Sequence, residues 1–315
     1  MALDSLQRRN RIEPHSTGRR IDYLTERDLF WFEKLYRHGP LPSTYLVAYS
    51  RALGYTVDKK ALDRLTLLFH EATTAHKAPY LDRPFQQHNT QLRYQPSVYD
   101  VRPAAKKALE EAGRLPEYAP THAIGMWWYH DFMLACITAS IELACLREPD
   151  KYRFIFHDEI CGDISSHLSF PVTFTDITGK KRTQLLNPDR AFGIHYLKDN
   201  SVRYFLVEAD RGTETVNSAS AGRKRLLDTD LQYRQFIGKL DYKEAMLFDG
   251  GIVLLNVMTS EQRMHNLMGL IKPTNYMAFK ALPIFGREFK SPPVMYDLFT
   301  DPWARPGKGN FWVNK

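Results

Sequence analysis

Residues 204–213 read YFLVEADRGT, an apolar run that ends in two acids and a glycine. The apolar residues predict a β-strand, and because side chains alternate faces along a strand, Glu208 and Asp210 are expected on the same side. A third acid, Asp189, lies in the sequence Asn-Pro-Asp at the start of the predicted hairpin that contains this strand. Hard cations such as Mg²⁺ are held by a few carboxylates together with phosphate and water oxygens. The three acids therefore suit a divalent metal site for phosphate chemistry. Acid pairs at strand ends are common, however, so the three acids by themselves favour the alternative of an ordinary charged strand end.

The segments on either side of this strand predict a sheet covered by helices. A long, mostly apolar helix is expected at 125–147, and another helix follows the acidic strand at 226–243. A strongly apolar strand at 252–258 precedes a helix at 260–271. The other strands are expected at 152–157, 170–175, 183–186, 191–197, 202–209 and 276–279. This order predicts an α/β (α+β) fold in which helices flank a mixed sheet.

The amino-terminal part of the chain predicts a small helical domain. Thr25 and Asp28 resemble a capping box, with Asp in place of the usual Glu or Gln, and the helix that follows is expected to end at residues 38–40, His-Gly-Pro. Three short helices with tight turns, followed by extended segments, are typical of a winged helix-turn-helix. The later helices are expected at 43–53, from 56–58 onward and at 102–112, with the wing between 79 and 101.

Basic residues accompany this helical domain. In a helix-turn-helix the amino-terminal part of the third helix enters the major groove of DNA. The basic arm that precedes the domain offers a second contact, with the minor groove or with phosphates. The alternative is a three-helix scaffold whose Lys and Arg side chains form only a solvated face. The candidate DNA contacts are Thr56, Lys59, Lys60 and Arg64 from the third helix, and Arg19 and Arg20 from the arm.

The composition is that of a globular protein. The chain has 315 residues, 43% hydrophobic and 25% charged, which is enough for two modest cores. The net charge of +7 favours polyanionic partners. The cysteines, Cys136, Cys145 and Cys161, form no CxxC pair and suit a reducing cytoplasm as free thiols. No secretory signal or apolar run of spanning length is expected, and nucleotide-binding GxxxxGK[ST] and GxGxxG motifs are missing from the sequence.

Over residues 23–280 the chain resembles the replication-relaxation family of plasmid and mobile-element proteins. Members of that family resemble a winged helix domain joined to a restriction-endonuclease-like, PD-(D/E)XK, core. The matching pieces are LTERDLFWFEKLYRHGPL from residue 24, VYDVRPAAKKALEEAG from 98, NPD from 187, FLVEADRGTE from 205 and LLNVMTSEQR from 254.

The resemblance implies roles for individual residues. Asp189 would be the first metal-binding acid and Glu208 the second, with the carbonyl of Ala209 as a further ligand and Glu142 on the preceding helix as an additional acid. Asp210 stands where the nuclease signature has a lysine that orients water and steadies the developing charge. Lys239, or Lys224, on the following helix would then supply that lysine.

Together these features predict a cytoplasmic DNA-binding protein of a plasmid or mobile element. Its partners would be double-stranded DNA and replication or transfer proteins, and its cofactor Mg²⁺, with Mn²⁺ as a substitute. The protein would be a metal-dependent nuclease or nickase acting in replication or DNA relaxation; the alternatives are a catalytically silent accessory factor and a protein-interaction module. The predicted parts are a basic flexible arm at 1–20, a winged helix-turn-helix at 21–115, a PD-(D/E)XK-like domain at 123–282 and an extended carboxy-terminal arm at 283–315.

Overall fold

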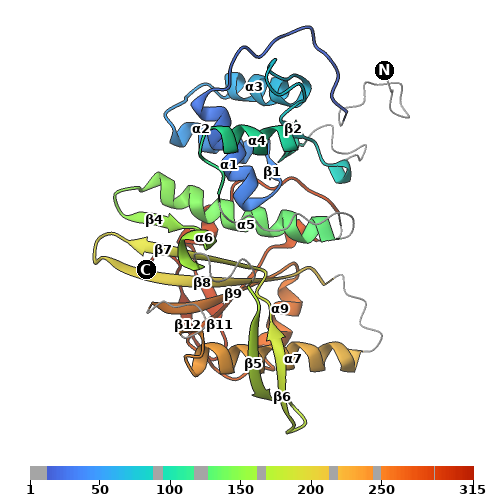
Figure 1. Cartoon of the computed structure of the whole chain (residues 1–315). Helices are drawn as coiled ribbons and strands as arrows, with labels where there is room; N and C mark the ends of the chain where they lie inside the picture. The colour runs from blue at the N-terminus through green and yellow to red at the C-terminus, as the bar shows by residue number, and fades with distance from the viewer. Residues whose placement is uncertain are drawn as a thin grey trace. The chain divides into compact units, whose positions relative to one another are not determined.

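The chain forms two compact units, each described by itself. The first contains Met1–Leu143 and Phe289–Tyr296, and the second contains Ala144–Glu288 and Asp297–Lys315. The computed structural model (Figure 1) describes residues 13–87, 95–116, 127–161, 168–212, 219–243, 250–286 and 288–315, with side chains left out at 161 and 219–226.

The first unit begins with three helices and a small sheet. The capping box at Thr25 and Asp28 is confirmed, and it starts the first helix. That helix ends at Gly39, whose φ of 108° lies in the region that glycine adopts without strain. The elements are α1 (Glu26–His38), β1 (Leu41–Pro42), α2 (Ser43–Ala52), α3 (Asp58–His70), β2 (Leu81–Asp82), a 3₁₀ turn (Phe85–Gln87), β3 (Val98–Val101) and α4 (Pro103–Glu111). The strands form an antiparallel sheet in the order β1-β3-β2.

The boundary of the first unit lies further along the chain than the predicted 21–115. Helix α5 (Trp128–Arg147) is apolar on all sides, and its residues up to Leu143 belong to this unit. Polar contacts join it to the preceding helices: the hydroxyl of Tyr45 on α2 lies 3.0 Å from that of Ser140. The backbone N–H of Met295 also donates to Ser140, which ties part of the predicted carboxy-terminal arm into the same core. The first unit therefore extends to Leu143 and includes Phe289–Tyr296, because α5 packs with the preceding helices. The linker sequence does not reveal this packing.

Helix α5 also revises the expectation that no apolar segment is long enough to span a membrane. Among the described helices, it is the one long and apolar enough by length and composition to cross a bilayer. However, 78% of its apolar window is buried inside the protein, as in the core helix of a globular domain. Its two cysteines, Cys136 and Cys145, are buried and free, as predicted.

The second unit is built on a seven-stranded mixed sheet, so the predicted α+β architecture is confirmed at that level. The strand order is β12-β11-β10-β9-β8-β7-β4. Strands β4, β7 and β8 pair antiparallel, whereas β8, β9 and β10 are parallel and need the crossover helices α7 and α9. The bounds are β4 (Tyr152–Ile155), α6 (His157–Cys161), β7 (Arg190–Tyr196), β8 (Ser201–Asp210), α7 (Ala219–Gly238), β9 (Gly251–Met258), α9 (Glu261–Met268) and β10 (Met277–Ala281). A separate antiparallel hairpin is formed by β5 (Phe170–Thr175) and β6 (Lys181–Leu186).

One face of the sheet carries the core beneath α7 and α9 (Figure 1). Leu206 of β8 and Leu254 of β9 pack there with Tyr233 and Phe236 of α7 and Leu267 of α9. Because side chains alternate along a strand, Glu208 and Asp210 continue the row of Leu206 toward the carboxyl end of β8. The core thus fixes the face on which the acids emerge.

The end of the chain is not wholly the extended arm that was predicted. It forms α10 (Asp297–Thr300), β11 (Trp303–Arg305) and β12 (Lys308–Phe311), and β11 extends the sheet beside β10. Trp303 is fully buried, and its indole N–H donates to the carbonyl of Leu298 at 2.9 Å. Trp303 and Phe311 of this segment therefore belong to the core of the second unit.

Candidate functional site

Asp189 is held against the end of β8 by two hydrogen bonds to the backbone of that strand, one from its own backbone and one from its carboxylate. It lies in the turn between β6 and β7, and its N–H donates to the carbonyl of Val207 at 3.1 Å. Its Oδ2 accepts the N–H of Ala209 at 2.8 Å. The pairing of Arg190 with Val207 in the β7–β8 ladder fixes this register. The structure therefore brings the carboxylate of Asp189 beside the Glu208–Ala209 peptide, across 20 residues of sequence.

Glu208 is anchored by a tyrosine that the sequence did not single out. The hydroxyl of Tyr233 on α7 donates to Glu208 Oε1 in a short hydrogen bond. Burial raises the pKa of Tyr233 well above its usual range, and the negative charges of Glu208 and Asp189 raise that pKa further. Asp189 accepts the N–H of Ala209, the residue next to Glu208, so the two acids lie near one another at the end of β8 and are called here the acidic pair.

Asp210 is neutralised by an arginine, which revises its assignment to the metal site. Its Oδ2 lies 2.6 Å from Nε of Arg263 on α9, and its Oδ1 accepts the N–H of Gly212 at 2.7 Å. A carboxylate engaged on both oxygens by protein donors is poorly placed to bind a cation as well. Asp210 is therefore an ion-pair partner of Arg263 at the end of β8.

A small pocket opens beside the acids. It has a volume of about 90 Å³, and its polar part is formed by Glu208, Asp210, Asp230 and Asn256. Strand register places Asn256 of β9 opposite Glu208. Asp230 has a raised pKa because of burial, opposed by its hydrogen bond with Arg234. Thr229 and Tyr233 of α7 also line the pocket. Its apolar lining comes from Ala209, Leu254, Val257, Met258, Leu267, Ile271, Met277 and Phe279.

The residues present fit a magnesium ion that is shared with a phosphate. Within the described residues, Asp, Glu, His and Cys side chains form no group of three or more around one metal position. Mg²⁺ is usually bound in proteins through one or two carboxylates plus substrate phosphates and water. The Asp189–Glu208 pair supplies two carboxylates at the end of a rigid strand, which matches that requirement.

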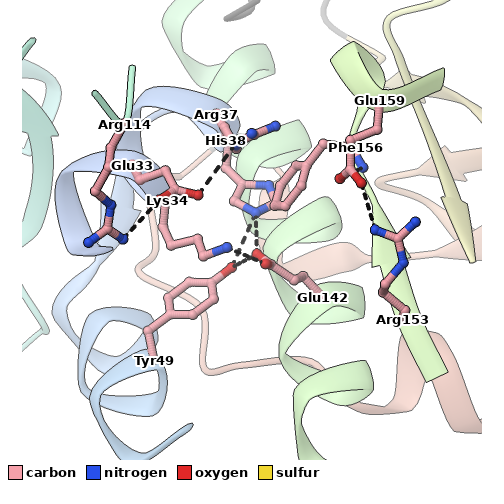
Figure 2. A network of polar contacts seen from close by, with 10 residues as sticks. All are labelled: Glu33, Lys34, Arg37, His38, Tyr49, Arg114, Glu142, Arg153, Phe156 and Glu159. Carbon is pink, nitrogen blue, oxygen red and sulfur yellow. Dashed lines mark hydrogen bonds and ion pairs between the residues drawn. The ribbon is translucent and has the colours of Figure 1, made fainter. Parts of the chain in front are cut away.

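Glu142 has a different role from the additional metal ligand that was expected. It is buried within the first unit and accepts hydrogen bonds from Lys34 Nζ at 2.5 Å, His38 Nε2 at 2.7 Å and Tyr49 Oη at 2.6 Å (Figure 2). Burial would raise the pKa of Glu142, but the charge of Lys34 and the hydrogen bond from His38 lower it to about 2. Three donors from α1 and α2 occupy this carboxylate, so it fastens α5 to the first unit instead of binding a metal.

Lys239 is not placed to act on the acidic pair. It follows the last residue of α7 and is exposed. The pocket is lined by Thr229, Asp230 and Tyr233 from an earlier part of that helix. At a rise of 1.5 Å per residue, Lys239 lies about 9 Å further along the axis than Tyr233. The side chain of Lys224, the other lysine considered, lies outside the described residues.

The predicted DNA contacts divide into two groups. Arg19 and Arg20 of the arm are exposed, as are Thr56, Lys59 and Lys60 around the start of α3, while residues 1–12 lie outside the described range. Arg64 instead forms a bidentate pair with the buried Asp28, with Nη2–Oδ2 at 2.6 Å and Nε–Oδ1 at 3.1 Å. Its assignment as a DNA contact is revised, because its guanidinium joins α3 to the capping residue of α1.

Tyr233 and Arg263 are the functional candidates that the sequence did not reveal. Tyr233 reads as one apolar position on the face of a helix, and Arg263 follows the helix-capping residue Ser260 in the first turn of α9. Only the pairing of β8 with β9 brings them to the acids. Family models of known proteins give no match to the chain, and neither curated proteins nor solved structures give one.

Proposed function

We propose that this protein binds double-stranded DNA through its first unit and hydrolyses a phosphodiester bond at Asp189 and Glu208 of its second unit. The observation that carries the proposal is the acidic pair: the turn before β7 and the end of β8 converge, with Asp189 bonded to the Ala209 N–H. Tyr233 holds Glu208 in position beside it. Mg²⁺ is the cofactor that this pair would hold.

The order of elements supports DNA binding by the first unit. The order α1-β1-α2-α3-β2-β3 with a β1-β3-β2 sheet resembles a winged helix. In a winged helix the start of the third helix contacts the major groove. Lys59 and Lys60 are exposed at that place, and Thr56 lies just before the helix. Exposed lysines there would neutralise phosphates on either side of the groove.

The topology of the second unit supports the nuclease-like role. An antiparallel meander, β4-β7-β8, is followed by the crossover helix α7 and the parallel strand β9. This order resembles that of a PD-(D/E)XK core, and in that comparison Asp189 and Glu208 would correspond to its first two signature carboxylates. When bound, Mg²⁺ would supply Lewis acidity toward a phosphate oxygen and an activated water. Asp189 and Glu208 would hold the ion, and Tyr233 would keep Glu208 oriented.

A second candidate is a catalytically silent accessory factor in replication or transfer of a mobile element. It is favoured by Asp210, which takes the place of the usual lysine and is paired with Arg263. In that case the acidic pair would still bind a divalent ion and a DNA phosphate, but no strand would be cut.

Cleavage of plasmid DNA separates the two candidates. Supercoiled DNA is incubated with the wild type in Mg²⁺, Mn²⁺ or EDTA, and with Asp189→Asn and Glu208→Gln. Metal-dependent nicking that both variants lose supports the nuclease. Asp199→Asn is the matched control, because Asp199 is an exposed acid that bonds only within its turn, to Ser201. DNA binding with no nicking under any metal supports the accessory factor, and no DNA binding at all contradicts both.

A further inference from the structure

Arg263 is fixed in place by groups on three sides. The hydroxyl of Ser260 caps α9 by accepting the N–H of Arg263, which sets the backbone at the first turn. Its Nε lies 2.6 Å from Asp210 Oδ2. Gly212, with a φ of 63°, lies under the side chain: a Cβ there would be 3.6 Å from Nη1 and 3.9 Å from Cδ of Arg263. The side chain is therefore oriented although 35% of it is exposed.

The outer edge of this guanidinium is available to a ligand. Within the described part of the chain, hydrogen bonds to Arg263 involve only its backbone N–H and Nε, so its two Nη atoms bond to none of those residues. A guanidinium has five N–H donors in a rigid fork that matches phosphate oxygens. Asp210 engages the Nε donor, so the N–H groups of the two terminal nitrogens remain as donors for a ligand.

Two other paired arginines of the second unit, Arg234 and Arg153, have different surroundings. Arg234 is bound on both sides, by Asp230 at 2.7 Å and by the carbonyl of Lys272. Arg153 pairs with Glu159 at 2.7 Å (Figure 2), but its side chain is 56% exposed. The pair lies on β4 and α6, and β4 is an edge strand separated from β9 by β7 and β8. Arg263 is distinguished by its pairing with Asp210, which lines the same pocket as Glu208.

We propose that Arg263 is a phosphate-binding residue of the site formed by Asp189 and Glu208, and that Asp210 is the positioning residue that aims it. This inference rests on the proposed function, since it names the contact for a DNA phosphate at that site. In the nuclease signature, a lysine on the strand provides the positive charge. Here Arg263, from the neighbouring helix α9, would provide it instead. This arrangement also gives a reason for an acid at position 210, because a lysine there would repel the guanidinium of Arg263.

Equilibrium DNA binding tests the contact apart from cleavage. Affinity for a duplex is measured in Ca²⁺ over a series of salt concentrations for the wild type, Arg263→Ala, Arg263→Lys and Asp210→Asn. Arg263→Ala should weaken binding about tenfold or more at low salt and lower the slope of log K against log salt by about one unit. Arg263→Lys should keep the slope and lose part of the affinity, since lysine lacks the fork. Asp210→Asn should lower the affinity less than Arg263→Ala.

Arg153→Ala is the matched control, because it removes another arginine paired with a carboxylate in the same unit. Its affinity and slope should equal those of the wild type. Wild-type slopes in Arg263→Ala would overturn the assignment of Arg263 while leaving the proposed function in place. Failure of the wild type to bind DNA would instead contradict the proposed function, and the inference with it.

A direct probe of the guanidinium uses inorganic phosphate. The ¹⁵N–¹H signal of Arg263 Nε, identified by its loss in Arg263→Lys, should shift on addition of phosphate and shift less in Asp210→Asn. If the Arg263 Nε signal stays fixed in phosphate while other arginine signals shift, the proposal is overturned. This outcome is read from the wild type and does not depend on the stability of any variant.

Discussion

Lys34 Nζ lies 2.5 Å from Glu142 Oε1, and both side chains are at least 94% buried. The ammonium comes from α1 and the carboxylate from α5, 108 residues apart in sequence. His38 and Tyr49 complete the shell around Glu142. Such a group is costly to desolvate, and it is tolerated because each charge has a partner. Removing one partner is therefore more harmful than removing both.

Single and double substitutions at this pair should give a clear non-additive pattern. Lys34→Met alone leaves a buried carboxylate without its countercharge and should lower the free energy of unfolding by about 3–5 kcal/mol. The double variant Lys34→Met, Glu142→Leu should recover much of that loss. Urea unfolding gives the values. Lys151→Ala breaks an exposed pair with Glu148 and should change stability by less than about 0.5 kcal/mol. Equal losses at Lys34 and Lys151 would contradict the buried arrangement.

The same group predicts an acid-sensitive first unit. The pKa of Glu142 is about 2 in the folded protein, below its ordinary value of 4.5, so its stabilisation is complete above 4.5 and is lost as the pH falls toward 2. Burial also lowers the pKa of His38 below 6.5, which adds a loss of stability as the pH falls below 6.5. Melting temperatures measured from pH 8 to pH 3 should fall across both ranges. In Glu142→Gln the lower part of this fall should be reduced, and an unchanged profile would remove Glu142 as its cause.

Divalent ions should stabilise the second unit through the acidic pair alone. At a concentration one hundred times the Kd, Mg²⁺ or Mn²⁺ adds about 2.7 kcal/mol to the free energy of unfolding. Asp189→Ala and Glu208→Ala should lose this increment. Asp210→Ala should keep it, because Asp210 is paired with Arg263. Calorimetric melting with each ion provides the comparison, and loss of the increment in Asp210→Ala would return that acid to the metal site.

A fragment of residues 1–115 should be much less stable than one of residues 1–147. The shorter chain lacks α5, on which Tyr45 and Tyr49 find their partners Ser140 and Glu142. It also lacks Phe132 and Met133 of α5, which are buried in the first unit. Circular dichroism should show a cooperative melt for residues 1–147 and a broader one at lower temperature for 1–115. Identical melts would restore the boundary expected from the sequence.

Local signals in the sequence predicted most helices and strands and the acidic pair. Side-chain contacts between residues far apart in the sequence could not be predicted from it. The alternation that places Glu208 and Asp210 on one face is a property of the strand itself, and the capping box joins Thr25 and Asp28, which are three residues apart. The Asp210–Arg263 contact joins residues 53 apart and depends on the crossover that sets β9 beside β8. Glu142 was assigned to a metal because nothing near it in sequence reveals Lys34.

The last prediction separates DNA contact from structural charge on α3. Lys59→Glu with Lys60→Glu should weaken duplex binding and lower the salt slope by about two units, since both side chains are exposed and each lost phosphate contact removes about 0.9 of a unit. Their melting temperature should stay near that of the wild type. Arg64→Ala should do the reverse: it leaves Asp28, which is fully buried, without its guanidinium partner and should lower stability by about 2 kcal/mol or more. Its salt slope, measured below the melting transition, should match the wild type. A reduced slope in Arg64→Ala at wild-type stability would mean that Arg64 contacts DNA after all, and an unchanged slope in the double lysine variant would remove α3 from the DNA surface.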